Sequence, residues 1–202
     1  KISMVKSSNF SSDELINLSQ KINFISQLKH PSFLKFIGFS PVDFKNKPRA
    51  VIVTELVTNG TLEHILEAER KEKIIPEWND TKKLINIYGI AAGMSYLHLK
   101  NVLHQDLKPE NIYLNDYLFP KISDFGLSSF SNDSDRNMTY QSAAGMKGNP
   151  IYSAPEVLQY NKHSKSSDVY SFALIVYEIV SKKIPFNEIS NKNDIFNEGI
   201  NF

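Results

Sequence analysis

The segment from Ser167 to Val180 constrains the fold of this chain more than any other part of the sequence. If it is helical, apolar side chains point in nearly every direction, and they are Tyr170, Phe172, Leu174, Ile175, Val176 and Ile179. A helix that is apolar all round has to be buried at the centre of a core. The densest part, Phe172–Val180, is interrupted by Glu178 and is too short to cross a bilayer. We therefore expect a helical unit built around this segment, and we expect no membrane partner.

The first part of the chain has a different pattern. Residues 11–28 carry apolar side chains at steps of three and four, which predicts a helix that ends before Pro31. Residues 33–39 and 50–54 are rich in aromatic and β-branched side chains, and they predict two antiparallel strands.

Helical patterns dominate from there on, and Thr61 and Thr81 are the expected N-caps of two helices. This order of elements predicts an α+β fold with two lobes. The small, β-rich lobe would cover residues 1–56, and the larger, mainly helical lobe would cover residues 57–202.

The composition excludes several classes of protein. The 202 residues include 23 Lys and Arg against 22 Asp and Glu, so the net charge is +1. A chain that is so close to neutral lacks the basic surface of a nucleic-acid-binding protein, and we expect no nucleic acid partner. There is no cysteine, which excludes disulfides and thiolate zinc sites.

Residues 104–126 carry a set of polar side chains that suits phosphoryl transfer. Asp106 and Lys108 offer a carboxylate and a cation two residues apart. Asn111 and Asp124 offer the hard oxygen ligands that Mg²⁺ prefers. A metal held by Asn and Asp, beside a separate carboxylate that can accept a proton, is what transfer of a phosphoryl group to a hydroxyl requires. Each pair is common by itself, but the whole set in this order is specific.

Three of these motifs together resemble those of the eukaryotic-type protein kinases. They are the catalytic loop His104–Asn111, the metal-binding motif Asp124–Gly126 and the activation-segment anchor Ala154–Glu156. The segment Phe36–Phe39 is similar to that of the tyrosine-kinase-like group, and Lys108 is typical of Ser/Thr kinases. The resemblance covers nearly all of the chain.

The resemblance implies a set of roles for the catalytic loop. Asp106 would accept or orient the substrate hydroxyl, and Lys108 would contact the γ-phosphate. Asn111 and Asp124 would hold Mg²⁺. It also implies ATP and Mg²⁺ as cofactors, proteins as substrates, a cytoplasmic location and a role in signalling.

Other positions acquire roles from the same resemblance. The backbones of Glu55 and Val57 would bind adenine, with Thr54 behind the ring and Tyr113 beneath it. A hydrophobic spine would be tied down by Asp168, and its members would be Ile25, Phe36, His104 and Phe125.

The sequence departs from the family pattern in several places. No glycine precedes Gly38, so the phosphate-binding glycine loop is absent. The active-site lysine would be Lys1, with Lys6 as a poorer candidate. Lys21 stands where the helix Glu that pairs with this lysine is expected, and Gln105 replaces the usual Arg. We expect a kinase domain that is truncated at both ends, with an incomplete small lobe and without the last helices beyond Phe202.

These departures leave two functions open. The first is ATP- and Mg²⁺-dependent transfer to Ser or Thr of protein substrates. The second is a pseudokinase or non-catalytic interaction module, which Lys21 and the missing glycine loop favour. A small-molecule phosphotransferase is disfavoured, because the segment Gly148–Glu156 resembles a platform for protein substrates.

Overall fold

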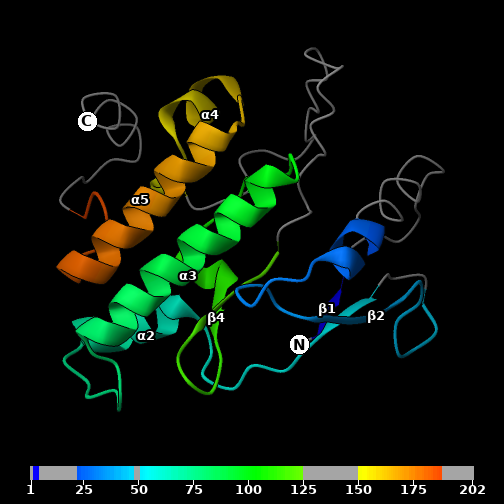
Figure 1. Cartoon of the computed structure of the whole chain (residues 1–202), viewed down its shortest axis with the longest axis horizontal. Coiled ribbons are helices and arrows are strands. Elements are labelled where there is room, and N and C mark those ends of the chain that lie inside the picture. Colours follow the sequence, from blue (N-terminus) through cyan, green and yellow to red (C-terminus); the bar gives the residue numbers. More distant parts are fainter. Residues whose placement is uncertain (1, 5–21, 48–50, 125–149, 188–202) are drawn as a thin grey trace.

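A computed structural model describes residues 2–4, 22–47, 51–124 and 150–187 of the chain. A small sheet and a short helical segment lie beside a larger group of helices (Figure 1). The predicted α+β class, with a small β-containing part and a helical part, is confirmed.

The small part contains one antiparallel sheet. Its strand order is β1 (Ile2–Met4), β3 (Val51–Thr54), β2 (Phe36–Ser40). The predicted antiparallel pairing of the two aromatic and β-branched segments is confirmed by the register of β2 on β3. Residues 22–27 are helical, and the rest of the helix predicted over 11–28 lies almost wholly outside the described residues.

Strand β2 begins three residues later than the sequence pattern predicts. Phe33 and Leu34 are instead buried between the two parts, with exposed fractions of 3% and 5%. The amide of Leu34 donates to the carbonyl of Ile122 at 3.1 Å, and the amide of Ile122 donates to the carbonyl of Ser32 at 2.6 Å. The segment before β2 therefore joins the small part to the helical part.

Two helices open the larger part. Helix α2 (Leu62–Arg70) starts at the predicted N-cap, because the Thr61 hydroxyl accepts a hydrogen bond from the His64 amide at 3.3 Å. Helix α3 (Asp80–Leu99) is capped by Asn79, whose Oδ1 accepts from the Lys82 amide at 3.1 Å. The prediction of Thr81 as the cap was wrong, since Asn79 is a strong N-cap residue and starts the helix two positions earlier.

A run of short elements follows α3. The chain forms the 3₁₀ turn η1 (Pro109–Asn111) and an antiparallel hairpin of β4 (Ile112–Leu114) and β5 (Pro120–Ile122). After the residues that are not described come the 3₁₀ turn η2 (Pro150–Tyr152) and helix α4 (Pro155–Tyr160).

Helix α5 (Lys165–Ser181) contains the apolar segment with which the sequence analysis began. It starts with a capping box between Ser164 and Ser167. Its inner face is completely buried at Ile175 and Ile179, and it joins the main core with Leu62, Leu66, Ile90, Leu97, Ile112 and Ile122.

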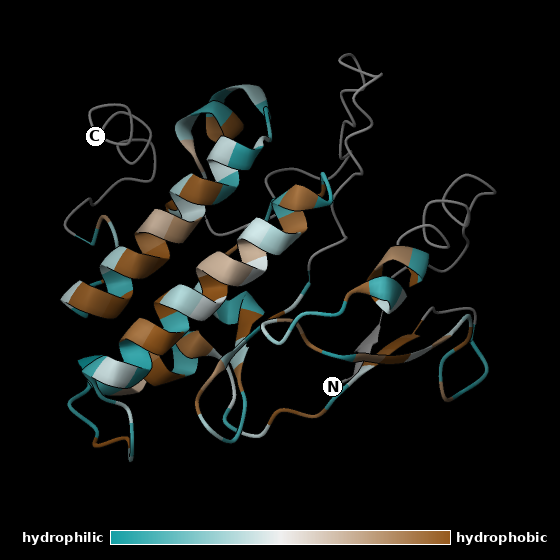
Figure 2. Ribbon diagram, viewed as in Figure 1, coloured by the Kyte–Doolittle hydropathy of each residue, from teal (hydrophilic) through white to brown (hydrophobic). Residues whose placement is uncertain are grey.

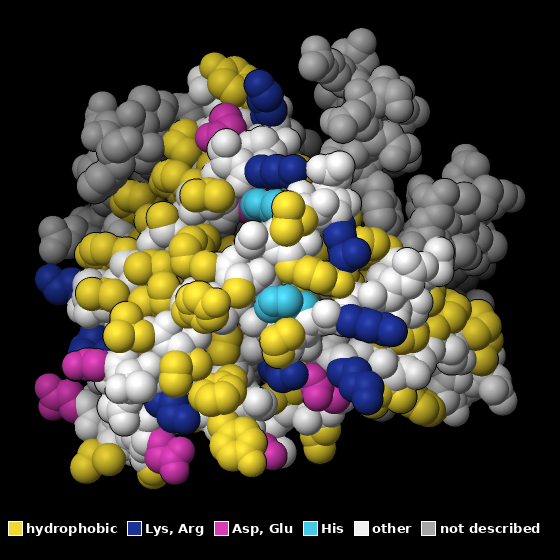
Figure 3. All heavy atoms as spheres, in the orientation of Figure 1, with side chains coloured by type: hydrophobic (Ala, Val, Ile, Leu, Met, Phe, Trp, Pro, Cys, Tyr) yellow, Lys and Arg dark blue, Asp and Glu magenta, His cyan; other side chains and the backbone are white. Residues whose placement is uncertain are grey.

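The outer face of α5 is not covered by any of the described residues. Val169 and Val180 are 56% and 66% exposed. Figure 2 shows apolar colouring along much of this helix, and Figure 3 shows hydrophobic side chains gathered on the surface over α3 and α5. The expectation that core surrounds this helix on all sides is met only on its inner face. None of the described helices is both long and apolar enough to cross a membrane.

Helix α3 lies very close to the hairpin because two of its residues are glycines. A Cβ atom at Gly89 would lie 2.6 Å from Pro120 Cγ, and one at Gly93 would lie 2.7 Å from Ile122 Cδ1. These separations are far below van der Waals contact. Because glycine has no side chain, these two positions allow α3 to approach β5, the strand that leads to Asp124, this closely.

We expect Gly89→Val to destabilise the fold by about 1–3 kcal/mol, because the side chain would overpack the contact with the Pro120 ring. Urea denaturation measures the change. Gly38→Val is the matched control, since nothing lies within 4 Å of a Cβ at Gly38. Equal stability of the two variants would contradict the close packing at Gly89.

Candidate active site

The carboxylate of Asp106 lies at the centre of a polar cluster just before η1. Lys108 Nζ lies 3.0 Å from Asp106 Oδ1 and 2.9 Å from Oδ2. Asn111 Nδ2 donates to Asp106 Oδ2 at 3.0 Å and to the Asp106 carbonyl at 2.7 Å. The Asp106 side chain is 43% exposed, whereas that of Lys108 is only 17% exposed. The carboxylate is thus open to a reactant while its two partners hold it in place.

The β4–β5 hairpin brings Asn111 and Asp124 together. Ile112 pairs with Ile122, so the residues just outside this pair are also neighbours. The Ser123 amide donates to the Asn111 carbonyl at 2.8 Å, and Ser123 Oγ lies 3.0 Å from both that carbonyl and Asp124 Oδ2. Asp124 is therefore the next residue after Ser123, which is hydrogen-bonded to Asn111.

The donor set fits Mg²⁺. The nitrogen of the Asn111 side-chain amide is turned toward Asp106, which leaves its oxygen for a metal, and Asp124 adds a carboxylate. Among the described residues, no group of three or more His, Cys, Asp or Glu side chains could hold a metal ion. Mg²⁺ is commonly bound by one or two protein carboxylates together with phosphates, so a two-residue site next to Asp106 suits a nucleotide-bound ion.

The backbone is left-handed on both segments that carry these residues. Gln105 has φ +65° and Asp124 has φ +59°. Residues other than Gly, Asn and Asp seldom occupy this left-handed region, so the strain falls on Gln105 and not on Asp124. Such strain persists where the surrounding structure enforces it, often at functional sites.

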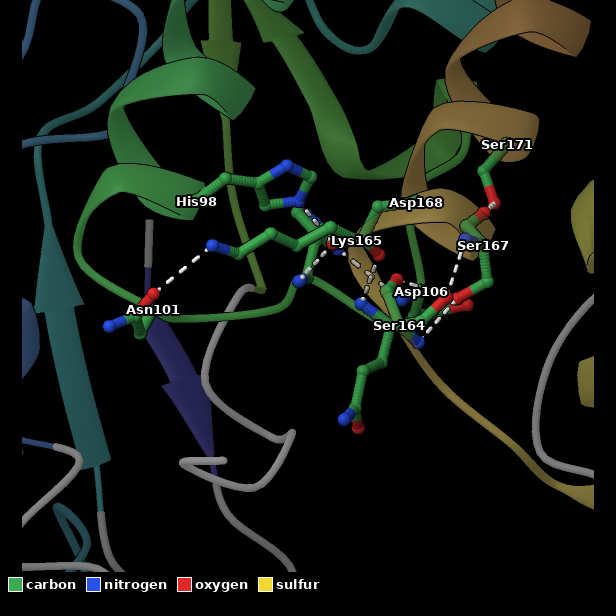
Figure 4. A network of polar contacts seen from close by, with 10 residues as sticks. His98, Asn101, Asp106, Ser164, Lys165, Ser167, Asp168 and Ser171 are labelled. Carbon is green, nitrogen blue, oxygen red and sulfur yellow. Dashed lines mark hydrogen bonds and ion pairs between the residues drawn. The ribbon is translucent and has the colours of Figure 1, made fainter. Parts of the chain in front are cut away.

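Asp168, in the first turn of α5, fixes the catalytic loop from behind (Figure 4). Its Oδ1 accepts from the Gln105 amide at 2.9 Å, and its Oδ2 accepts from the His104 amide at 2.8 Å. Nε2 of His98 lies 2.8 Å from the same Oδ2. Burial opposes ionisation of Asp168, but the hydrogen bonds from His98 and the two amides outweigh it and lower its pKa.

His104 connects the loop to the strand before Asp124. The ring is 1% exposed, and this burial lowers the pKa of His104, so the imidazole is neutral. Its Nδ1 accepts from the Asp106 amide at 3.3 Å, which makes Nε2 the protonated nitrogen. Nε2 in turn donates to the Ser123 carbonyl at 3.1 Å.

The comparison with protein families agrees with this geometry. A model described as "Protein kinase domain" matches residues 2–201. This chain belongs to the protein kinase family.

Several curated proteins are similar to this kinase domain. It is 36% identical over 177 residues to the probable serine/threonine-protein kinase drkC of Dictyostelium discoideum, covering 86% of this chain and 22% of that protein. It is 32% identical over 188 residues to the dual specificity protein kinase shkC of the same organism, covering 92% and 35%. It is 34% identical over 189 residues to ephrin type-B receptor 5 of Gallus gallus, covering 93% and 18%. The chain thus spans 18–35% of the length of these relatives.

Three of the residues predicted to surround adenine lie along one segment of the kinase domain, and the fourth, Tyr113, lies on β4. Thr54 ends β3, and Glu55 and Val57 follow it, both half-buried. The segment then reaches Thr61, which forms an isolated antiparallel bridge with Tyr113 of β4. The fold therefore places Tyr113 beside the end of this segment, and its contact with adenine stays a prediction.

The side chain of Glu55 is engaged between the two parts of the domain. Its Oε1 accepts from the Lys35 amide at 3.0 Å and lies 3.2 Å from Lys121 Nζ. The Glu55 amide donates to the Lys35 carbonyl at 2.9 Å. These contacts hold the predicted adenine-binding segment against β5, the strand that also leads to Asp124.

Three predictions about the small part of the domain fall outside the described residues. Lys1, Lys6 and Lys21 are not among them, so the active-site lysine and its helix partner stay predictions. Phe125, one predicted member of the spine, is also outside.

Reasoning from the sequence missed two residues of the site. Ser123 connects Asn111 to Asp124, and its signal was a polar residue between the apolar end of β5 and Asp124. His98 is the third partner of Asp168, and its signal was the single histidine of the helix, placed in its last turn.

A second buried carboxylate anchors η2, which lies beside the catalytic loop. Glu178 of α5 is completely buried, and its Oε1 accepts from Arg70 Nη1 at 2.5 Å while its Oε2 accepts from the Tyr152 hydroxyl at 2.5 Å. Arg70 Nη2 also donates to Glu63 Oε1 at 3.0 Å. Burial next to Glu178 raises the pKa of Tyr152, so the phenol remains a donor.

We expect Asp168 to make the stability of the domain depend on acid pH. Because the folded state lowers its pKa, the ionised side chain contributes stability that is complete above about pH 4 and is lost as the pH falls through the folded pKa. Asp168→Asn should cost about 1–3 kcal/mol at neutral pH and should remove this part of the acid dependence. Urea unfolding across a series of pH values measures both effects. Asp116→Asn, at an exposed loop position, is the control, and an acid dependence unchanged in Asp168→Asn would contradict the assignment.

Proposed function

We propose that this kinase domain transfers the γ-phosphoryl group of ATP to serine or threonine hydroxyls of protein substrates. The observation that carries the proposal is the position of the Asp106 carboxylate between Lys108 Nζ and Asn111 Nδ2. Lysine at position 108 supports Ser/Thr specificity. Of the similar proteins, drkC is a probable serine/threonine-protein kinase and shkC is a dual specificity protein kinase. The similarity of Phe36–Phe39 to the tyrosine-kinase-like group agrees with this.

Each residue of the site would have a separate role in the transfer. Asp106 orients the substrate hydroxyl and accepts its proton as the new bond to phosphorus forms and the bond to ADP breaks. Lys108 Nζ lies beside the same carboxylate, where the reaction would take place. Its positive charge would stabilise the negative charge on the transferred phosphoryl group. Asn111 and Asp124 would hold Mg²⁺, which neutralises phosphate oxygens when bound.

The rest of the kinase domain would position the nucleotide. The backbones of Glu55 and Val57 would bind adenine, next to Thr54 and above Tyr113, and Lys1 would reach the phosphates. Because ATP is the donor, we propose the cytoplasm as the location and signalling through protein phosphorylation as the role.

Asp106→Asn should lower kcat for peptide phosphorylation by about 10²–10⁴-fold, because the amide cannot accept the hydroxyl proton. The assay measures transfer from ³²P-labelled Mg·ATP to two peptide libraries, one with Ser and Thr as acceptors and one with Tyr alone. Asp80→Asn, at the exposed start of α3, is the matched control.

The same assay separates the alternatives. Transfer to the Ser/Thr library that is lost in Asp106→Asn supports the proposal, and transfer to the Tyr library alone would overturn the specificity. Equal counts for Asp106→Asn and the unchanged chain would favour the non-catalytic module, for which Lys21 is the argument in the sequence.

A further inference from the structure

Three exposed lysines from different parts of the chain gather around Tyr96 and Asn101, near the end of α3. The Lys29 amide donates to the Tyr96 hydroxyl at 3.3 Å, and Lys100 Nζ lies 5.1 Å from the centroid of the Tyr96 ring. Lys165 Nζ donates to Asn101 Oδ1 at 3.1 Å, and Asn101 is the residue after Lys100 (Figure 4). We call Lys29, Lys100 and Lys165 the lysine cluster.

The lysine cluster has no ion-pair partner within the part of the chain that the structure describes. The stretches that carry it, residues 22–42, 91–105 and 161–167, contain no Asp or Glu. Asp168 follows the last of them, but it is buried and bonded to the catalytic loop. Figure 3 shows a band of Lys, Arg and His side chains with few acidic side chains among them. This surface is therefore positive, although the net charge of the chain is only +1.

The position of Lys165 is unfavourable for the helix that carries it. Lys165 is the first residue of α5, and the dipole of a helix favours negative charge at this end. Lys100, by contrast, is the C-cap of α3, where a positive charge is favourable. Helix stability therefore explains Lys100 but not Lys165. An anionic group beside Lys165 is attracted by the side chain and by the helix end together.

An apolar groove begins at the same lysine. Lys165 lines a groove of about 440 Å³ between α3 and α5, together with Leu99, Val169 and Phe172. Leu99 precedes Lys100 and is 82% exposed, and Val169 is 56% exposed. Surfaces that bind proteins combine an apolar centre with a polar, charged rim. A peptide with both acidic and apolar side chains fits such a surface, whereas a nucleic acid would leave the apolar walls uncovered.

We propose that the lysine cluster and the adjoining groove form a docking surface for a segment of a partner protein that has an acidic half and an apolar half. The carboxylates of this segment pair with the lysine cluster, and its apolar side chains enter the groove beside Leu99 and Val169. Because exposed ion pairs are individually weak and are screened by salt, the affinity is moderate and depends on ionic strength. The proposal does not rest on phosphoryl transfer.

Fluorescence anisotropy with the whole 202-residue chain tests the docking surface. The probe is a labelled peptide of about 12 residues with a Leu-rich half and a Glu-rich half, a length that spans a groove between two helices. A second peptide has Lys in place of Glu, and a third has Ser in place of Leu. We expect the probe to bind at least about tenfold more tightly than the Lys peptide and about threefold more tightly than the Ser peptide. Its affinity should fall about threefold or more between about 50 and about 200 mM salt.

Variants of the chain locate the binding. Lys165→Glu should weaken the probe about three- to tenfold, because it reverses a charge at the rim of the groove. Its Tm should not fall, since Glu is favourable in the first turn of a helix. Lys73→Glu is the matched control and should leave the affinity within about twofold, because Lys73 is exposed and precedes the start of α3, whereas the cluster is at its other end. Leu99→Ser should weaken the probe but not the Ser peptide.

Several results would overturn the proposal. One is no binding of the probe, and another is an equal loss of binding in Lys165→Glu and Lys73→Glu. Binding of a single-stranded oligonucleotide as tight as that of the probe, with no effect of Leu99→Ser on either, would show a site for any anion. Self-association of the unchanged chain that Leu99→Ser abolishes, measured by light scattering, would assign the groove to a second copy instead of a partner.

Discussion

One buried carboxylate holds together the part of the structure on which function depends. Asp168 is 2% exposed and accepts hydrogen bonds from the catalytic loop at two successive amides and from His98 of α3. Three separate pieces of chain therefore meet at one side chain. Isolated buried charge is costly, and only this complete set of donors makes an ionised Asp168 favourable in the core. The geometry around Asp106 follows from that requirement.

The contact between the two parts of the domain has a different physical basis. It includes backbone hydrogen bonds of Ile122 with Ser32 and Leu34, and the contact of Glu55 with Lys121. Both contacts are on β5, and both lie within three residues of Asp124. The strand that carries a predicted metal ligand is thus also the strand to which the small part is attached.

Much of the architecture could be predicted from the sequence because local patterns determine it. The period of α5, the cap at Thr61 and the pairing of β2 with β3 needed no information beyond neighbouring residues. The error at the start of β2 occurred where a tertiary contact outweighed local preference, whereas the misplaced cap of α3 was a choice between two local signals. Phe33 and Leu34 have the character of a strand, yet burial against β5 takes them out of the sheet. The proximity of Asp106, Lys108 and Asn111 could be predicted from their short spacing, whereas Ser123 and His98 take part through contacts that spacing does not reveal.

The hydrogen bonds of Arg70 and Tyr152 to the buried Glu178 limit how this sequence can change over time. Loss of Arg70 alone leaves a carboxylate in the core with one donor fewer, and loss of Glu178 alone leaves the guanidinium without its buried partner. Either single step is strongly destabilising, whereas replacing the charged pair together by apolar residues of similar volume leaves no unpaired charge in the core. Positions 70 and 178, which are 108 residues apart in the chain, should therefore vary as a pair among descendants of this gene.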